Sequence, residues 1–435
     1  MKLPAYPSYR ASRADWLGEV PEHWGVKRLK WSVAGCINGV WGDEPDGVDD
    51  VVCVRVADFD RDRFSVTTDS LTIRSVEPKQ RQSRKLRKGD LLIEKSGGGD
   101  KQLVGCVVYF DHEFEAVCSN FVARMPVDPE LPGRYWSYVH AALYAGRLNY
   151  PAIKQTTGIQ NLDAGEYLNT LAAYPPVDEQ ENIADFLDWK TAQIDALIAK
   201  KQELIAKLKE KRLAVITQAV TKGLDPDAPL RDSDIPWLGK VPAHWKVKRL
   251  RYCAGLVTSG SRGWAQHFAD SGALFLRITN LDRASIELLL EDIQRVEPPE
   301  GAEGERTFTK AGDLLISITA DLGSVAVIPS DLEPAYVSQH LSLVRLDAAD
   351  IDPKWIAYSV FSHAGKFQLL MAGYGGTKVQ LSLGDIKEIV FCHPPSLEEQ
   401  QGILDFVRLE TARADKLISL AFLAIEQLTE YRSAL

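Results

Sequence analysis

The chain contains two copies of one long sequence pattern. Residues 16–24 return as residues 237–245, 221 positions later, and both read Trp-Leu-Gly-x-Val-Pro-x-His-Trp. Residues 89–93 likewise match residues 312–316, both with the sequence Gly-Asp-Leu-Leu-Ile. Solenoids and propellers repeat in much shorter units of about 20–50 residues. We therefore expect two copies of a whole domain, each with a trailing helix.

The bulk composition is that of an ordinary globular protein. A length of 435 residues predicts two or three domains, and the repeat favours two. The hydrophobic share of 45% and the charged share of 26% lie in the usual range. No segment approaches the roughly 18 apolar residues of a membrane span, and the first residues carry no apolar signal core. We expect a cytoplasmic protein without membrane association.

The cysteines and histidines have no disulfide or metal-binding spacing. The six cysteines are scattered without a Cys-x-x-Cys pair, and the eight histidines are dispersed. This pattern is typical of reduced cysteines that pack as small hydrophobic residues. No metal site is expected.

The formal net charge of −9 argues against nucleic-acid binding, but the distribution of charge does not. Residues 79–88 hold six positive charges in ten positions, and residues 27–30 and 246–251 form two further basic clusters. Phosphate contacts depend on local basic surface and not on total charge. The clusters are open to two interpretations, phosphate contact or solvated charges on loops and strand edges.

Each copy begins with a globule of short strand signals. Apolar and β-branched runs bounded by Gly, Asp or Pro predict strands at residues 51–56, 90–93, 104–109 and 121–124. The second copy repeats them at residues 274–278, 313–318, 324–328 and 341–345. One helix follows in each copy, at residues 136–148 and 353–371. We expect two mixed α/β domains, at residues 1–178 and, including a linker, at residues 223–398.

A long amphipathic helix is predicted after each globule, at residues 179–222 and 399–435. Both segments lack proline and space apolar residues alternately by three and four, which is typical of a coiled coil. The expected seam residues are Ile183, Leu187, Ile194, Leu197, Leu204 and Leu208 in the first helix, and Ile403, Val407, Ala414, Leu417, Ala421 and Leu428 in the second. Because large seam residues in one helix match alanines in the other, we expect antiparallel pairing of the two helices. The alternative is that each helix packs only on its own globule.

These features together predict an α+β protein with a pseudo-two-fold internal repeat. Two similar mixed α/β domains would be separated by two long antiparallel coiled-coil helices. Two related but unequal modules on one chain fit the reading of two related but unequal half-targets.

The motifs of an independent enzyme are missing from the sequence. The chain has no Asn/Asp-Pro-Pro-aromatic tetrapeptide of a methyltransferase and no Gly-x-x-x-x-Gly-Lys-Ser/Thr nucleotide loop. Asp90 and Glu94 are spaced as in some nuclease metal sites, but the matching residues of the second copy are Asp313 and Ser317. The Gly-Asp pair of both copies is better interpreted as a turn that enters a buried strand. No catalytic residue is expected.

Loops that match in position but differ in sequence are the candidates for DNA contact. Arg and Lys suit guanine or phosphate, Asn and Gln suit adenine, and glycine lets the backbone approach a phosphate closely. The candidate DNA-binding residues are Arg55, Lys95, Ser96, Lys101, Lys154, Gln155, Thr157 and Gln160 in the first copy, and Arg262, Arg277, Thr319, His340, Thr377, Lys378 and Gln380 in the second. Arg55 and Arg277 recur at one strand position, where pairing with a carboxylate is the alternative.

Four signatures occur together in this chain. They are the doubled Trp-Leu-Gly-x-Val-Pro-x-His-Trp motif, the motif Pro-Pro-x-x-Glu-Gln at Pro175 and, with one extra residue, at Pro394, residues 219–225 at the end of the first helix, and the repeat of about 220 residues. In this combination the chain resembles the specificity (S) subunits of type I restriction–modification systems. The resemblance covers essentially the whole chain.

The resemblance implies a non-catalytic DNA-binding subunit. Its two target recognition domains would each read one half of a split, asymmetric sequence in double-stranded DNA. The paired helices would set the spacing and hold two methyltransferase (M) subunits, which methylate adenine at N6, and restriction/translocase (R) subunits would join them. This chain itself would bind no cofactor, because S-adenosylmethionine, ATP and Mg²⁺ belong to the partners. The alternative is a coiled-coil scaffold that assembles a multi-protein complex without binding DNA.

Overall fold

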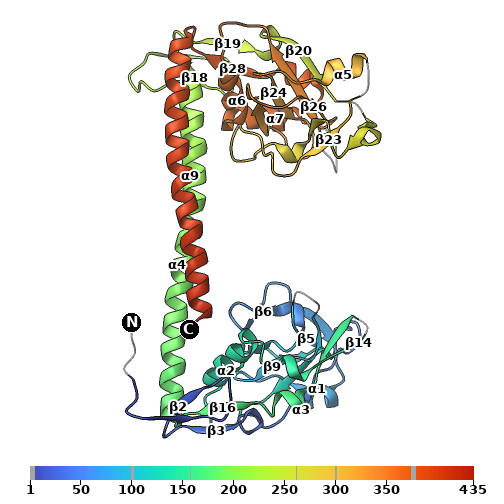
Figure 1. Ribbon diagram of the computed structural model, residues 1–435, viewed down its shortest axis with the longest axis vertical. Coiled ribbons are helices and arrows are strands. Elements are labelled where there is room, and N and C mark those ends of the chain that lie inside the picture. Colours follow the sequence, from blue (N-terminus) through green and yellow to red (C-terminus); the bar gives the residue numbers. More distant parts are fainter. Residues whose placement is uncertain (1–4, 99–101, 157, 261, 299–300, 374–378) are drawn as a thin grey trace. The chain divides into compact units, whose positions relative to one another are not determined.

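The computed structural model describes residues 5–98, 102–156, 158–260, 262–298, 301–373 and 379–435. They belong to two compact units, whose elements are labelled in Figure 1. Unit 1 comprises the chain up to Ile198 together with Glu426–Leu435, and unit 2 comprises Ala199–Ile425. Each unit combines helices with several small sheets, so the predicted α+β class is confirmed. Among the described helices, none is long and apolar enough to cross a membrane.

The main sheet of unit 1 has six strands. In spatial order they are β4 (Ile37–Asn38), β13 (Val122–Met125), β9 (Leu91–Glu94), β11 (Val107–Tyr109), β7 (Ser65–Val66) and β6 (Phe59–Asp60). Two three-stranded sheets have the orders β12 (Ala116–Cys118), β5 (Asp50–Val54), β8 (Thr72–Ser75) and β10 (Ser96–Gly97), β15 (Ile159–Leu162), β14 (Ile153–Thr156). Helix α2 (Gly133–Ala145) places the fully buried Trp136 in one core cluster with Leu91 and Ile93.

Unit 2 repeats this topology. Strand β24 (Leu314–Ser317) pairs antiparallel with β27 (Leu341–Leu346) and β25 (Val325–Val327), just as β9 pairs with β13 and β11. The parallel pair β22 (Ala273–Leu276) and β26 (Ala335–Val337) corresponds to β5 and β12. At the sheet edge, β20 (Ala254–Ser259) corresponds to β4. The sequence repeat is therefore a repeat of strand order and register.

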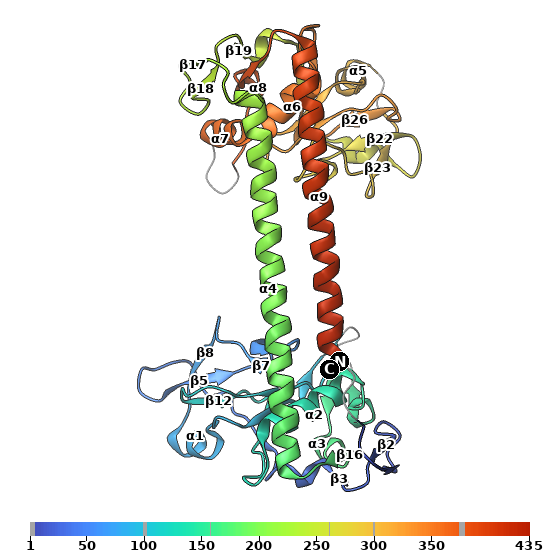
Figure 2. The ribbon, with the colours of Figure 1, turned by 90° about the vertical axis from the view of Figure 1, so that its left-hand side faces the viewer.

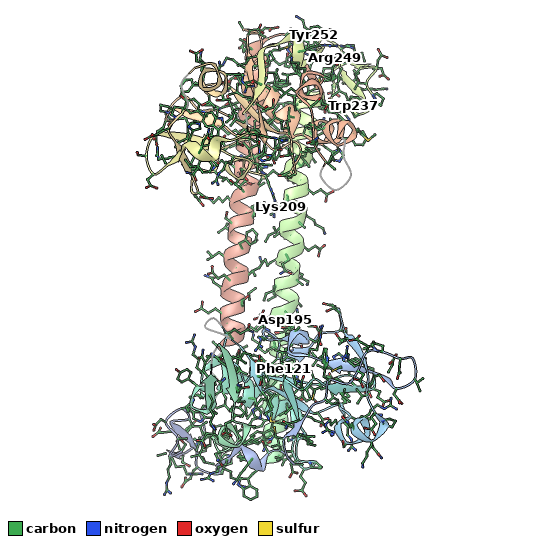
Figure 3. The ribbon with its side chains drawn as sticks, turned by 90° about the vertical axis from the view of Figure 1, so that its right-hand side faces the viewer. Phe121, Asp195, Lys209, Trp237, Arg249 and Tyr252 are labelled. Carbon is green, nitrogen blue, oxygen red and sulfur yellow. The ribbon has the colours of Figure 1, made fainter. Side chains whose placement is uncertain are left out.

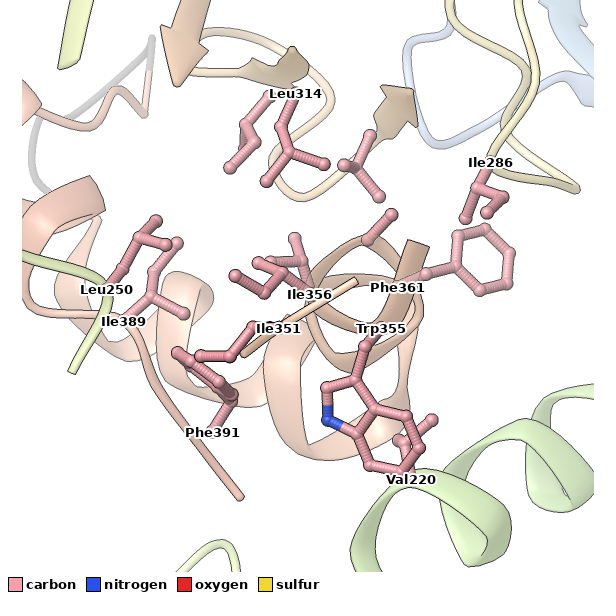
Figure 4. Packing of buried hydrophobic residues seen from close by; sticks show 14 of the residues in the cluster. Val220, Leu250, Ile286, Leu314, Ile351, Trp355, Ile356, Phe361, Ile389 and Phe391 are labelled. Atoms are coloured by element: carbon pink, nitrogen blue, oxygen red, sulfur yellow. The ribbon is translucent and has the colours of Figure 1, made fainter. Parts of the chain in front are cut away.

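The core of unit 2 surrounds helix α6 (Pro353–Phe361). Figure 4 shows the buried Trp355 of this helix close to Val220, with Leu314 of β24 in the same apolar cluster. Val220 belongs to the last turns of helix α4 (Val177–Lys222), which are therefore part of the globule's core. Complete burial of each large apolar side chain contributes about 1.5–3 kcal/mol.

The helix predicted at residues 353–371 is two helices, so this prediction was wrong in one respect. Helix α6 ends at Phe361, and α7 (His363–Ala372) begins after Ser362. Ser362 has extended backbone geometry, and its hydroxyl accepts a hydrogen bond from the Gly365 amide at 3.1 Å. A serine cap of this kind offers the backbone an alternative to continuing the helix.

The Gly-Asp turn that both copies share is confirmed. The glycine of each pair has a left-handed backbone conformation, with φ of +98° in the first copy and +82° in the second. The following carboxylates form ion pairs inside the globules, Asp90 with Arg124 and Asp313 with Arg345, both at 2.6 Å. Asp90 and Asp313 thus fix two strands of their sheets to each other.

The shared His-Trp and Glu-Gln motifs fasten each long helix to its globule. In unit 1, Glu179 in the first turn of α4 contacts the imidazole of His23 at 2.6 Å and accepts a hydrogen bond from the Trp24 indole at 2.9 Å. In unit 2, helix α9 (Leu397–Ser433) repeats this arrangement through a glutamate that contacts His244 and Trp245. The motifs are therefore structural anchors, which explains why both copies keep them.

Segments of α4 and α9 lie side by side and antiparallel in both units (Figures 1 and 2). In unit 1, Arg432 near the end of α9 pairs with Asp195 at 2.8 Å. In unit 2, Arg212 of α4 pairs with Asp415 of α9 at 3.0 Å. A higher residue number on α4 therefore goes with a lower residue number on α9. The pairing of the helices with each other is thus found within each unit.

The seam between these helices differs from the predicted one by one residue at three places. Leu197, Leu204 and Leu417 are 47%, 42% and 51% exposed, so the prediction was wrong for them. Each leucine precedes an isoleucine, and Ile205, which is 6% exposed, shows which member of the pair turns inward. One residue rotates a side chain by about 100° around a helix, which is enough to move it out of the seam. Of the other predicted positions, Ile194, Ile403, Val407, Ala414 and Ala421 are buried, and Ile183, Leu187, Leu208 and Leu428 are half-buried.

Candidate nucleic-acid interface

In unit 1, loops that are far apart in the sequence meet beside strand β10. The amide of Lys95 donates to the carbonyl of Phe121 at 2.8 Å, and the amide of Gly39 donates to the carbonyl of Val122 at 3.0 Å. Strand β10 pairs with β15, which aligns Ser96 with residue 161. The sheet thereby holds three loops in one backbone network, and their exposed side chains share one surface.

Unit 2 builds the same network from matching positions. The amide of Ile318 donates to the carbonyl of His340 at 3.1 Å, as Lys95 does to Phe121. Thr319 forms a β-bridge with Gln380, which corresponds to the contact of β10 with β15. The Thr319 hydroxyl also lies 3.0 Å from Nδ1 of the His340 ring. Three predicted contact residues of the second copy therefore lie together.

One glycine in each unit lets the first loop approach the sheet closely. A Cβ atom on Gly39 would lie 2.1 Å from the carbonyl oxygen of Cys118, and a Cβ on Gly260 would lie 2.1 Å from that of Val337. Both glycines follow the edge strands β4 and β20, which correspond in the repeat. The loop can therefore take this position only because Gly39 and Gly260 have no side chain.

We expect Gly260→Ala to lower the free energy of unfolding of unit 2 by about 1–3 kcal/mol, the usual cost of overpacking. The loop must move because the atom in the way is backbone. Hydrogen exchange of unit 2 amides in increasing denaturant measures the change. Gly402→Ala is the matched control, because nothing lies within 4 Å of its Cβ position in α9 and alanine favours helix. Equal stability of the two variants would contradict the expectation.

The two predicted arginines pair with carboxylates. Arg55 contacts Asp58 at 3.0 Å, and Arg277 contacts Asp292 at 3.3 Å. Each precedes a 3-10 turn, η2 (Val56–Asp58) or η6 (Ile278–Asn280), so the position is equivalent in both units. Both side chains are 33% exposed. The alternative of carboxylate pairing is therefore the one that the structure shows, and the exposed third remains accessible.

The remaining candidates of unit 1 differ in how far they can reach outward. Gln160 is 4% exposed, and its side-chain oxygen accepts a hydrogen bond from the Val104 amide at 3.0 Å. This residue supports the loop from inside, because a polar group in that environment has to be satisfied by the protein. Lys154 is exposed and pairs with Asp163 at 2.7 Å, and Gln155 is exposed on the same strand.

Two further candidates lie at the start of the glycine-rich loop. Lys95 is half-buried and donates to the side chain of Asn38 at 2.7 Å, and the Ser96 hydroxyl donates to Asn161. In unit 2, Arg262, His340 and Gln380 are exposed and Thr319 is half-buried. The predictions for Lys101, Thr157, Thr377 and Lys378 lie outside the described residues.

Several residues of this surface were not among the candidates predicted from the sequence. Trp41 is 38% exposed, and Phe121, labelled in Figure 3, is 50% exposed beside the exposed Asn120. The residue of the second copy that corresponds to Asn120 is Gln339. Residues 119–121 read Ser-Asn-Phe, and residues 338–340 read Ser-Gln-His. An amide side chain at the same loop position in both copies was a signal that could have identified them.

Part of the basic clusters pairs with neighbouring carboxylates. Arg81, Lys85 and Lys88, on and after helix α1 (Pro78–Arg84), all have carboxylate oxygens within 4.0 Å. The cluster at residues 246–251 is paired in the same way. These contacts favour the interpretation as solvated ion pairs. Arg84 differs, because it donates to the carbonyl of Asn38 at 3.1 Å and so lies next to the loop network.

The cysteines stand apart from this surface. All six are free, and five of them are buried. Burial raises the pKa of the Cys106, Cys118 and Cys392 thiols to about 12, so they stay protonated and poorly nucleophilic at neutral pH. Among the described residues, no group of three or more His, Cys, Asp and Glu side chains is placed to hold a metal ion.

Comparison with known proteins gives a consistent result. No family model matches the chain. It is 22% identical over 330 residues to the type I restriction enzyme EcoBI specificity subunit of Escherichia coli, covering 72% of this chain and 67% of that protein. It is 23% identical over 430 residues to the StySPI specificity subunit of Salmonella potsdam, covering 95% and 88%. The curated proteins that this chain resembles are type I specificity subunits.

Two solved structures share the fold of this chain. A chain from a study of complex assembly and conformational transition of the type I R-M system matches with a TM-score of 0.70 at 14% identity, covering 95% of this chain and 97% of that one. The HsdS subunit from Thermoanaerobacter tengcongensis matches with a TM-score of 0.53 at 15% identity, covering 95% and 96%.

Proposed function

We propose that this chain is the DNA-reading specificity subunit of a type I restriction–modification complex. The observation that carries the proposal is the doubled loop network, in which equivalent backbone bonds hold different side chains. Two similar scaffolds with unequal loops suit a split, asymmetric target in double-stranded DNA. The likeness to type I specificity subunits in sequence, and to the HsdS subunit in fold, supports the same function.

In this proposal, residues 1–178 and 223–398 are the target recognition domains, and residues 179–222 and 399–435 are the spacer helices. Two M subunits carry S-adenosylmethionine and methylate adenine at N6, and R subunits contribute ATP- and Mg²⁺-dependent restriction. This chain supplies recognition and no catalysis. Arg262, His340 and Gln380 in unit 2, and Lys95, Ser96 and Asn120 in unit 1, are the proposed contact residues.

The test is a map of adenine methylation after co-expression with M subunits. We expect a two-part motif with wild type, and Asn120→Ala is expected to relax one base position in one half only. Gln380→Ala is expected to relax a position in the other half, since each good base contact is worth about 1–3 kcal/mol. That corresponds to roughly 5- to 150-fold in discrimination.

Lys354→Ala is the control, because this exposed cation lies on α6 outside the loop network. It should leave the motif unchanged. Unchanged motifs in both loop variants, with assembly intact, would favour the alternative function as a scaffold that leaves DNA reading to its partners.

A further inference from the structure

The loop surface of unit 1 opens into a cavity of about 950 Å³. Cavities of about 300–1,000 Å³ are typical of small-molecule sites. Three apolar side chains of its lining are well exposed, Trp41 at 38%, Phe121 at 50% and Ile159 at 56%. Because they are accessible from outside, we place them at the mouth. Trp41 and Phe121 come from two loops of the backbone network, and Ile159 begins strand β15, which pairs with β10.

Buried polar groups form the inner part of the same cavity. Glu94 is fully buried, and its Oε2 accepts a hydrogen bond from Arg61 at 2.8 Å. Among the described residues, neither Oε1 of Glu94 nor the hydroxyl of Ser119 has a hydrogen-bond partner. A Cβ on Gly97 would lie 3.0 Å from Oε1, so a larger residue at this position would crowd that oxygen.

An unmet acceptor of this kind favours a ligand that donates. A buried polar group without a partner costs about 1–3 kcal/mol, which a donor from outside would recover. Burial raises the pKa of Glu94, while Arg61 and the backbone amides of Cys106 and Gly105 oppose that rise.

The matching place in unit 2 is different. Ser317 replaces Glu94, and its hydroxyl donates to the carbonyl of Asp321. The tryptophan of the corresponding loop, Trp264, is 3% exposed and stacks on Phe275 with ring centroids 5.2 Å apart. The polar floor and the exposed ring are therefore properties of unit 1 and not of the shared scaffold.

We propose that this cavity receives a single nucleobase with an exocyclic amino group, cytosine or adenine, from the half-site that unit 1 reads. The inference rests on the proposed function. The amino group donates to Oε1 of Glu94, which matches the preference of Glu for such donors. Trp41 and Phe121 offer ring faces for stacking, which contributes about 1–3 kcal/mol per base.

The base has to leave the helical stack to enter. A fully buried carboxylate cannot be reached by the edge of a base that stays paired in the duplex. Extrusion of a base costs a few kcal/mol and is cheapest at a mismatch. The free energies of stacking and of the recovered hydrogen bond together are large enough to offset that cost.

The test uses the full chain assembled with M subunits and duplexes that carry its methylation motif. Each position of the unit 1 half-site is varied through all four bases. At one position we expect wild type to prefer cytosine or adenine by roughly 5- to 150-fold. We expect Glu94→Gln to reduce this preference to within about threefold, because an amide side chain both donates and accepts hydrogen bonds. A mismatch opposite that base should tighten wild-type binding several-fold, since unpairing is already complete.

Trp41→Ala is the second variant, because it changes the mouth and leaves the Glu94–Arg61 pair intact. It should weaken binding of the preferred base by roughly 5- to 150-fold and leave the unit 2 half-site preferences unchanged. The inference is overturned if wild type reads its motif but Glu94→Gln and Trp41→Ala alter no base preference, or if the mismatch weakens binding. Absence of any sequence preference in wild type would instead overturn the proposed function itself.

Discussion

Replacing Asp90 by alanine will lower the free energy of unfolding of unit 1 by about 3–5 kcal/mol, the usual cost of removing one partner of a buried ion pair. Asp90 accepts hydrogen bonds from Nε of Arg124 at 2.6 Å and from the Arg87 amide at 2.6 Å. The side chains of Asp90 and Arg124 are 6% and 9% exposed. The variant leaves a guanidinium that water reaches poorly and a turn amide without its acceptor.

The internal repeat supplies a graded comparison. Asp313→Ala removes the equivalent carboxylate in unit 2, but the side chain of its partner Arg345 is 25% exposed. Water can solvate that guanidinium more easily, so we expect a smaller loss. Hydrogen exchange of amides in β9 and β24, followed in increasing denaturant, measures each unit by itself.

The double variant Asp90→Leu with Arg124→Met is the control for the first prediction. Replacing both partners by apolar groups of similar volume is often neutral, so most of the stability should return. A loss below about 1 kcal/mol for Asp90→Ala alone would show that the arginine finds other partners, and it would contradict the prediction.

Acid will destabilise unit 1 because of one buried histidine. His140 is fully buried on α2, its Nδ1 lies 2.7 Å from the Tyr167 hydroxyl, and burial lowers its pKa to about 3. An unfolded histidine has a pKa near about 6.5, so the unfolded chain binds the proton more tightly. The stability from the neutral ring is complete above about pH 6.5 and is lost as the pH falls toward 3. At about 1.4 kcal/mol per pKa unit, the loss approaches about 4–5 kcal/mol.

His140→Ser is the matched control, because the equivalent residue of unit 2 is Ser359. The variant loses packing, so its stability at neutral pH will be lower. Its pH dependence between 6.5 and 3 should nevertheless be shallower than that of wild type. The pH dependence of unit 1 in the variant has to be compared with that of unit 1 in wild type. Unit 2 cannot serve as the reference, because burial also lowers the pKa of His393 there. An unchanged slope in the variant would contradict the assignment to His140.

Part of the candidate site could be predicted from the sequence, and the limit lies in long-range contacts. The loops were found because they occupy matching positions in the two copies but carry different residues. Thr319, His340 and Gln380 lie together as predicted candidates. Gln160, a predicted contact residue, is buried, and only the fold shows that its side chain accepts a hydrogen bond from the Val104 amide. Trp41 and Phe121 were missed because their exposure depends on neighbours that the sequence does not name.

The duplication, the α+β class, the presence of two long helices and the glycine turn before each buried strand were already determined by the sequence alone. These are properties of local pattern, namely repeat spacing, strand composition, the alternating spacing of three and four, and a conformation that glycine adopts readily. Only the tertiary structure decided which of two adjacent apolar residues enters the helix seam, where the helix at residues 353–371 breaks, and which arginines find carboxylates. The reason is physical, because neighbouring residues such as Leu204 and Ile205 have similar hydrophobicity, and only the packed partner selects between them. The cavity around Glu94 was likewise decided only by the tertiary structure, since its walls come from segments that meet only in the folded chain.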